Sequence, residues 1–218
     1  EDIQATQENP LVIWCEQGMG DAIQFCRYLY LFEEKKIPFI LSTRKNLLDL
    51  MKNWLPFSDK VVLERTWDPK TDNRTQIPLM SLPRLFKTEV YNVPNQCPYL
   101  YSPEVIPKDL LIDQAPGGIN IGFAWASNPD NKAMYRHKTM PPNLLLPHLI
   151  NLVDLDLIDL HSLQIGEDSK EIEKYNDNER IYNWDGKLDN FSDTAFVINQ
   201  LDLVISVDTA VAHLGGAL

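Results

Sequence analysis

The feature that most constrains the fold is a regular alternation of short apolar runs with helical patterns. The runs are rich in β-branched and aromatic residues, as in LVIW and INIGFAW, and the segments between them place apolar residues on one side of a helix. Short strands that alternate with helices are typical of βα units, in which helices cover a parallel sheet. The sequence therefore predicts an α/β fold with mostly parallel sheets.

The pattern occurs twice, and a stretch rich in proline and glycine, IPKDLLIDQAPGG, separates the two halves. Strands are expected near 11–16, 37–43 and 60–64, and then near 119–125, 157–164, 179–183 and 202–207. A further apolar stretch, IPLMSLP, covers 77–83 and leads into a proline-rich, irregular run. Helices are expected near 20–34 and 44–54, and then near 141–152, 168–176 and 192–200. We predict two domains, 1–110 and 111–218. The second is expected to be incomplete, because the chain stops at a helix that leaves the preceding strand without a neighbour on one side.

Charge and cysteine content exclude several classes of protein. The chain has 218 residues and a formal net charge of −11, whereas broad binding of nucleic acid or anionic membranes requires an excess of Lys and Arg on one face. Cys15, Cys26 and Cys97 are odd in number and lack metal-binding spacing, so we expect reduced thiols and a cytoplasmic protein. No apolar run approaches the roughly 18 residues of a membrane span, and the first residues lack a signal-peptide pattern.

The turn after the first strand, EQGMGDAIQF, holds Gly18, Gly20 and Asp21. A glycine turn before a helix usually binds an anion, because the helix N-terminus presents unpaired N–H groups, so a carboxylate there is unexpected. A dinucleotide fingerprint is disfavoured, because Ile23 replaces its third glycine and the second strand ends without an acidic residue. Two interpretations of Asp21 stay open. It caps the helix, or it is a general base that takes a proton from a hydroxyl nucleophile.

Basic residues crowd the segment NKAMYRHK, 131–138, directly after the strand INIGFAW. These are Lys132, Arg136, His137 and Lys138. We expect a loop here, at the strand end where α/β folds bind ligands, and local positive charge indicates phosphate. A solvated loop without function is the alternative.

The segment LDLVISVDTAVAHL, 201–214, delivers Asp208 from a strand and then begins a helix. The N–H groups of Thr209, Ala210 and Val211 could bind a pyrophosphate. Asp208 is expected to cap the helix or to orient a neighbour, because its charge opposes an anion. His213, one turn after Thr209, is either a core histidine or part of the site.

In this order, the motifs resemble the bacterial ADP-heptose transferases, glycosyltransferases with two facing Rossmann-like domains (GT-B). The shared features are the GxGD turn, Gly18 to Asp21, and the SVDTxxxHL helix start, Ser206 to Leu214. The stretches EQGMGDAIQFCRYL, IPLMSLPRLF, IGFAWASNPDNK, HSLQIG and NFSDTA are similar to the glycosyltransferase-like domains that follow tetratricopeptide repeats in many bacterial proteins. That likeness implies a repeat region before Glu1 in the full-length protein.

The resemblance implies a metal-independent, inverting transfer of a sugar from a nucleotide sugar to an acceptor hydroxyl, with no cofactor. It implies that Asp21 is the base and that Lys138, three residues before Pro141, neutralises the leaving phosphates. It also implies that Thr209, Ala210 and Val211 hold the pyrophosphate near His213, and that the stretch from Gln164 to Glu167 borders the nucleoside. Displacement at the anomeric carbon needs both a base and positive charge for the diphosphate.

Two other functions stay open. A catalytically inactive module of a repeat protein would keep the fold and lose the chemistry, and a nucleotide-sugar epimerase would isomerise the donor without an acceptor. Asp154-Leu-Asp156 has the spacing of the DxD metal motif of some glycosyltransferases, but it lies in an alternating run typical of solvated positions before a strand. We therefore expect no metal ion there. The acceptor could be a glycan, a lipid-linked sugar or a protein.

Overall fold

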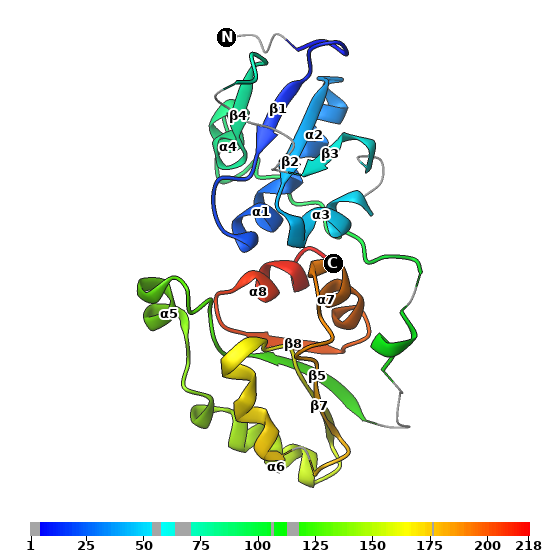
Figure 1. The fold of residues 1–218 in the computed structure, drawn as a ribbon, viewed down its shortest axis with the longest axis vertical. Helices are drawn as coiled ribbons and strands as arrows, with labels where there is room; N and C mark the ends of the chain where they lie inside the picture. Colours follow the sequence, from blue (N-terminus) through cyan, green and yellow to red (C-terminus); the bar gives the residue numbers. More distant parts are fainter. Residues whose placement is uncertain (1–4, 54–57, 64–70, 106, 113–117, 176) are drawn as a thin grey trace. The chain divides into compact units, whose positions relative to one another are not determined.

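A computed structural model describes residues 5–53, 58–63, 71–105, 107–112, 118–175 and 177–218, and Figure 1 shows the course of the chain. The chain forms two compact units, residues 1–101 with 216–218 (unit 1) and residues 102–215 (unit 2). Each unit contains one four-stranded sheet. The sequence placed the boundary after residue 110, and the assignment of an acceptor-side and a donor-side domain stays a prediction.

The sheet of unit 1 is parallel and has the strand order β3-β2-β1-β4. Its strands are β1 (Leu11–Trp14), β2 (Phe39–Thr43), β3 (Val61–Leu63) and β4 (Gln76–Pro78). The helices are α1 (Met19–Phe25), η1 (Cys26–Tyr28), α2 (Leu29–Glu34), α3 (Lys45–Lys52), η2 (Ser58–Lys60), η4 (Leu79–Ser81) and α4 (Leu82–Leu85). Since β2 and β3 lie on one side of β1 and β4 on the other, the strand order reverses between β1 and β4.

Apolar strands and aromatic rings form the core of unit 1. Val12 and Ile13 of β1 are fully buried, as expected for a central strand of a parallel sheet. Phe32 of α2 packs against Phe39 of β2 and against Phe86, with ring centroids 5.5 and 5.0 Å apart. These contacts hold α2 on the sheet.

The sheet of unit 2 is also parallel and repeats this topology, with the order β7-β6-β5-β8. Its strands are β5 (Ile119–Ala124), β6 (Ile158–Ser162), β7 (Ile181–Asn183) and β8 (Leu203–Ser206). The helices are η5 (Lys108–Leu110), α5 (Lys132–Lys138), η6 (Pro142–Leu144), α6 (Leu146–Asp154), η7 (Gly166–Tyr175), α7 (Phe191–Ile198) and α8 (Ala210–Gly215). The strand order here reverses between β5 and β8.

A buried polar network crosses the strands of unit 2. The His161 side chain is fully buried; its Nδ1 accepts from Trp184 Nε1 (3.2 Å), and its Nε2 lies 3.1 Å from Asn120 Oδ1. Since Nδ1 accepts a hydrogen bond, the proton of the neutral ring lies on Nε2, which donates to Asn120. Burial lowers the pKa of His161 to about 4, because a charged imidazolium is poorly solvated there.

The predicted α/β fold with parallel sheets is confirmed, and two local predictions need correction. The segment 131–138, expected as a loop, contains the helix α5, because Asn131 Oδ1 accepts from Met134 N (3.2 Å) and the following residues favour helix. The helix expected over 141–152 is split into η6 and α6, since prolines remove backbone donors. Residues 86–105 form neither helix nor strand, as their prolines indicated.

Candidate functional site

The glycine turn of unit 1 places Asp21 at the third position of α1. Gly18 N donates to Asp21 Oδ2 at 2.9 Å, so the carboxylate caps the start of the helix. Gly20 lies inside α1. A Cβ atom added at Gly18 would lie 3.1 Å from Asp21 Oδ2, closer than most Cβ contacts, so the glycine gives the carboxylate room. Because this bond uses one carboxylate oxygen, capping and proton transfer are compatible, and the role of Asp21 as a base stays a prediction.

Glu16 lies beside this turn, two residues after β1. Its Oε1 accepts from Met80 N at 3.1 Å, and Met80 belongs to η4, which follows β4 directly. Glu16 therefore links the ends of the two strands between which the order reverses. Its Oε2 is buried and has no hydrogen-bond partner in the part of the chain that the structure describes. Sequence reasoning missed Glu16, although its place just after a central strand is where α/β sheets bind ligands.

The corresponding place in unit 2 brings Lys138, Asp208 and His213 together. Lys138 Nζ, at the end of α5, forms an ion pair with Asp208 Oδ2 at 2.8 Å, and His213 Nε2 lies 3.7 Å from Asp208 Oδ1. The hydrogen bond from Lys138 lowers the pKa of Asp208, and the charges of Lys138 and His213 act in the same direction. Segments far apart in the sequence thus meet where the strand order reverses.

Helix α8 begins beside this ion pair. The Thr209 carbonyl accepts from Ala212 N and His213 N at 3.1 and 3.4 Å, and Thr209 Oγ1 lies 3.2 Å from Ser206 Oγ. The amides of Ala210 and Val211 precede these bonds and, as first-turn groups, have no acceptor within the helix. Their predicted contact with a pyrophosphate stays a prediction.

The two supporting residues expected near the nucleoside differ in their surroundings. Gln164 is buried, and its Oε1 accepts from Trp125 N and Ala126 N at 3.2 and 2.9 Å, which fixes the segment after β5. Glu167 is exposed and pairs with Lys170 at 2.7 Å. The amide oxygen of Gln164 is therefore already engaged by the backbone.

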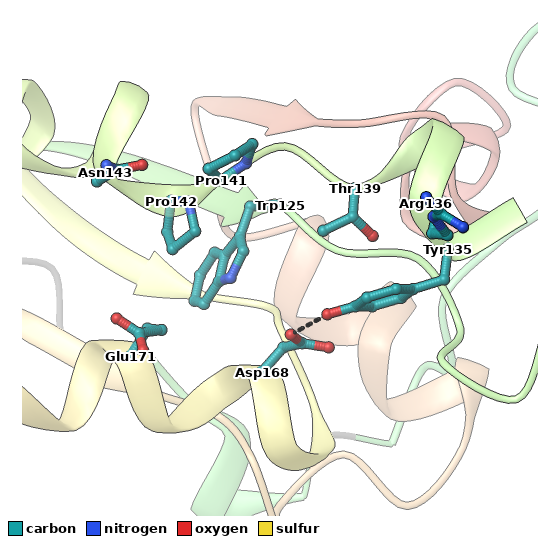
Figure 2. A pocket seen from close by; sticks show the side chains of 9 residues that line it. All are labelled: Trp125, Tyr135, Arg136, Thr139, Pro141, Pro142, Asn143, Asp168 and Glu171. Carbon is teal, nitrogen blue, oxygen red and sulfur yellow. Dashed lines mark hydrogen bonds between the residues drawn. The ribbon is translucent and has the colours of Figure 1, made fainter. Parts of the chain in front are cut away.

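Unit 2 contains a pocket of about 610 Å³, whose lining side chains are drawn in Figure 2. It is lined by Trp125, Tyr135, Arg136, Thr139, Pro141, Pro142, Asn143, Asp168 and Glu171. Tyr135 Oη donates to Asp168 Oδ1 at 2.6 Å, and this bond raises the pKa of Tyr135. The pocket adjoins the predicted residues at two points, since Thr139 follows Lys138 and Asp168 follows Glu167. Its lining comes from three separate segments, so no local motif announces it.

The fold is similar to that of solved glycosyltransferases. An E. coli heptosyltransferase, WaaC, in a structure with ADP, has a TM-score of 0.62 and 13% identity over 96% of this chain and 84% of its own. The glycosyltransferase TibC from enterotoxigenic E. coli has a TM-score of 0.62 and 11% sequence identity to this chain. The structure of TibC with ADP-D-β-D-heptose has a TM-score of 0.60 and 12% identity. This chain spans 58% of the length of TibC. No protein-family model and no curated protein matches the sequence. At these identities the likeness shows the fold, which is that of the GT-B glycosyltransferases.

The expectation that no metal or cofactor takes part is contradicted by one of these neighbours. TibC is described as iron-containing in both structures. Within the described ranges of this chain, no group of three or more His, Cys, Asp or Glu side chains could hold a metal ion, and Asp156 of the DxD motif pairs with Arg180 at 3.0 Å. The described residues alone therefore do not form an iron site, and the expectation that no metal takes part is withdrawn.

No helix among the residues that the structure describes is long and apolar enough to cross a membrane.

Proposed function

We propose that the chain belongs to a glycosyltransferase that moves a sugar from a nucleotide-sugar donor to an acceptor hydroxyl, with inversion at the anomeric carbon. One observation carries the proposal. A GT-B fold places a lysine, a histidine and a helix start together where the strand order of unit 2 reverses. Crevices at such points are where open α/β sheets bind ligands. The ADP and ADP-heptose in the similar structures support a nucleotide-sugar donor.

The donor diphosphate would bind at Lys138 and at the amides of Thr209, Ala210 and Val211. In the free protein Asp208 holds the Lys138 ammonium at 2.8 Å, and an arriving diphosphate would share or replace this partner. The larger negative charge of a diphosphate favours the exchange, because charge-assisted hydrogen bonds to phosphate are strong. His213 adds a further ring N–H donor beside Lys138.

The nucleoside would lie in the neighbouring pocket, near Gln164 and Glu167. The volume of the pocket, about 610 Å³, falls in the range of small-molecule sites. Tyr135 offers aromatic surface, and Asp168 and Glu171 offer acceptors for hydroxyl groups. The lining holds two carboxylates and one guanidinium, Arg136, and this net negative charge disfavours a phosphate inside the pocket, which is consistent with phosphate binding at Lys138 instead.

The acceptor would react at unit 1. Asp21 takes the proton of the acceptor hydroxyl, the oxygen forms a bond to the anomeric carbon, and the bond from that carbon to the diphosphate oxygen breaks. Lys138 and the α8 amides then stabilise the charge of the leaving diphosphate. The identity of the acceptor, a repeat region in the full-length protein and a cytoplasmic location stay predictions.

A binding experiment tests the donor site. The chain is heated with ADP, GDP, UDP, CDP or their sugar derivatives, and the stabilisation is measured; a ligand at 100 times its Kd adds about 2.7 kcal/mol to the free energy of unfolding. Lys138→Ala should weaken binding by roughly 10- to 100-fold, because it removes a hydrogen bond between charged groups. Lys52→Ala, an exposed change at the end of α3 in unit 1, is the control.

Two results would contradict the proposal. If none of these nucleotides stabilises the chain, the inactive-module alternative is favoured. If Lys138→Ala binds as tightly as the control, the donor phosphates lie elsewhere.

A further inference from the structure

Glu16 is the feature of unit 1 that the proposed chemistry leaves unexplained. In the described part of the chain, three buried side-chain atoms lack a hydrogen-bond partner: Glu16 Oε2, Ser42 Oγ and Ser162 Oγ. The two serines are small, and their hydroxyls rotate. Glu16 alone brings a carboxylate oxygen, which can only accept while it is ionised.

Leaving such an oxygen unpaired is costly. A buried acceptor without a donor costs about 1–3 kcal/mol, and more when it is charged. Native structures rarely contain such groups outside functional sites or sites filled by water or a ligand. Glu16 as a residue is only partly buried, but its Oε2 atom is shielded from solvent, and this oxygen calls for a hydrogen-bond donor from outside the described residues.

The position of Glu16 indicates where that donor comes from. Its other oxygen is held by Met80 N, so the side chain is fixed between the carboxyl ends of β1 and β4. The strand order of unit 1 reverses at this place, and ligands of open α/β sheets bind at such points. The equivalent place in unit 2 carries the Lys138 ion pair.

The charge of this place selects the chemistry of the ligand. Glu16 and Asp21 stand at the two ends of one short glycine turn. Two carboxylates repel phosphates and other anions, whereas they accept hydrogen bonds from hydroxyl groups. A neutral ligand with several hydroxyls fits this site.

We propose that Glu16 Oε2 accepts a hydrogen bond from a hydroxyl of a neutral saccharide, and that this saccharide is the acceptor. The inference rests on the proposed function, since Asp21 would take the proton of the reacting hydroxyl while Glu16 holds a second one. Glu16 is thus a binding residue that orients the acceptor and does not enter the transfer step.

Glu16→Gln tests this inference at one atom. The carbonyl oxygen of Gln can still accept from Met80 N, while its NH₂ group replaces the unpaired Oε2 and turns an acceptor into a donor. Binding of the methyl glycosides of glucose, galactose, mannose and N-acetylglucosamine is followed by ligand-observed NMR on the full chain. Glycoside concentrations reach about 20 mM, which detects millimolar Kd values. Glu34→Gln, an exposed change on α2, is the control.

We expect at least one glycoside to bind, and Glu16→Gln to weaken it about tenfold or more. The inference is overturned if no glycoside binds, or if Glu16→Gln and Glu34→Gln bind equally. Should Glu16→Gln fail to fold, the wild-type chain decides: the amide resonance of Met80 should shift on titration with the glycoside, and an unmoved resonance overturns the inference.

Adding ADP to the same samples separates this inference from the donor proposal. ADP should shift the amides of Asp208 and Thr209 and leave Met80 unmoved. Glycoside binding without ADP binding would reject the donor site and keep Glu16. ADP binding without glycoside binding would keep the donor site and reject the role of Glu16.

Discussion

The two units have the same strand order but opposite chemistry at the place where that order reverses. In unit 1, the ends of β1 and β4 carry Glu16, fixed by Met80 N, and the first turn of α1 carries Asp21. In unit 2, the segments after β5 and β8 carry Lys138 and Asp208 as an ion pair. A shared topology thus supplies two points of strand-order reversal, and the residues after the strands decide what each can bind.

The central strands of the two sheets also differ in the polarity of their buried side chains. The sheet of unit 1 is apolar at its centre, where Val12, Ile13 and Leu41 are fully buried. The sheet of unit 2 buries Asn120 and His161 in a hydrogen-bonded network instead. Below neutral pH, unit 2 should therefore respond through its buried His161, whereas the buried Cys26 and Tyr99 of unit 1, whose pKa values are raised by burial, stay protonated there.

The largest expected effect comes from removing the proposed base. Asp21→Asn should lower kcat for sugar transfer by about 100- to 10,000-fold, the usual contribution of a general base. The side-chain oxygen of Asn can still accept from Gly18 N, so the helix cap and the thermal midpoint should be kept. Transfer from the donor identified by nucleotide binding is the measurement.

Two further variants separate catalysis from capping. Asp49→Asn, an exposed change on α3, should leave both activity and stability unchanged. Asp21→Ala removes the cap as well and should lower the free energy of unfolding by about 1 kcal/mol. Equal activity of Asp21→Asn and Asp49→Asn would show that Asp21 is a cap and no base, and the carboxylates of unit 1 would then serve binding alone.

The second prediction concerns the acid sensitivity of unit 2. The pKa of His161 is about 4 in the folded chain and about 6.5 in the unfolded chain, so the unfolded state binds a proton first as the pH falls. Stability is therefore lost below pH 6.5, and linkage gives a loss of about 2 kcal/mol between pH 7 and pH 5. Protonation of Nδ1 would also break the hydrogen bond from Trp184.

Hydrogen exchange of peptides from each unit measures this difference. Peptides of β5 and β6 should lose protection between pH 7 and pH 5 more than peptides of β1 and β2. His161→Gln should flatten the pH dependence of unit 2, whereas His148→Gln, an exposed change on α6, should not. A loss of protection of the same size in both units would mean that His161 does not cause it.

The parts of the fold that could be predicted are those specified by short stretches of sequence. Apolar runs such as LVIW and INIGFA form β1 and β5, because buried parallel strands need little more than continuous apolar residues. The start of α5 was missed, although Asn131 followed by good helix formers is a local signal. Prolines at 141 and 142 limited the precision of the next helix boundary.

The candidate site was harder to predict, because its contacts join distant segments. The sequence placed Lys138 and Asp208 near the same strand ends, but their ion pair spans 70 residues and depends on β5 lying beside β8. Glu16 belongs to no sequence motif. Its side chain is positioned by the hydrogen bond from Met80 N, 64 residues later, and only the folded chain reveals this contact. The pocket at Trp125 and Asp168 likewise needs the folded chain.

The smallest expected effect is on stability at the ion pair itself. The Asp208 side chain is 63% exposed, and pairs of this kind contribute about 0–1 kcal/mol. Lys138 lowers the pKa of Asp208, so this contribution is present above the usual value of 3.8 and is lost as the pH falls through the lower value of the folded chain. Asp208→Asn should therefore change the free energy of unfolding at neutral pH by less than about 1 kcal/mol.

The same substitution, Asp208→Asn, also tests how Asp208 affects ADP binding at the donor site. If Asp208 only competes with the diphosphate for Lys138, Asp208→Asn should tighten ADP binding by about two- to fivefold, the fold-change that corresponds to an exposed pair. If Asp208 instead holds the Lys138 ammonium in the position that phosphate needs, ADP binding should weaken. Calorimetric titration at low and high salt separates the two. Salt screens the charges, so a change in ADP affinity caused by competition should shrink at high salt, whereas a change caused by positioning should shrink less. The first result would make the acidic partner in unit 2 a restraint on donor binding, in contrast to the carboxylates of unit 1, which we assign to the acceptor.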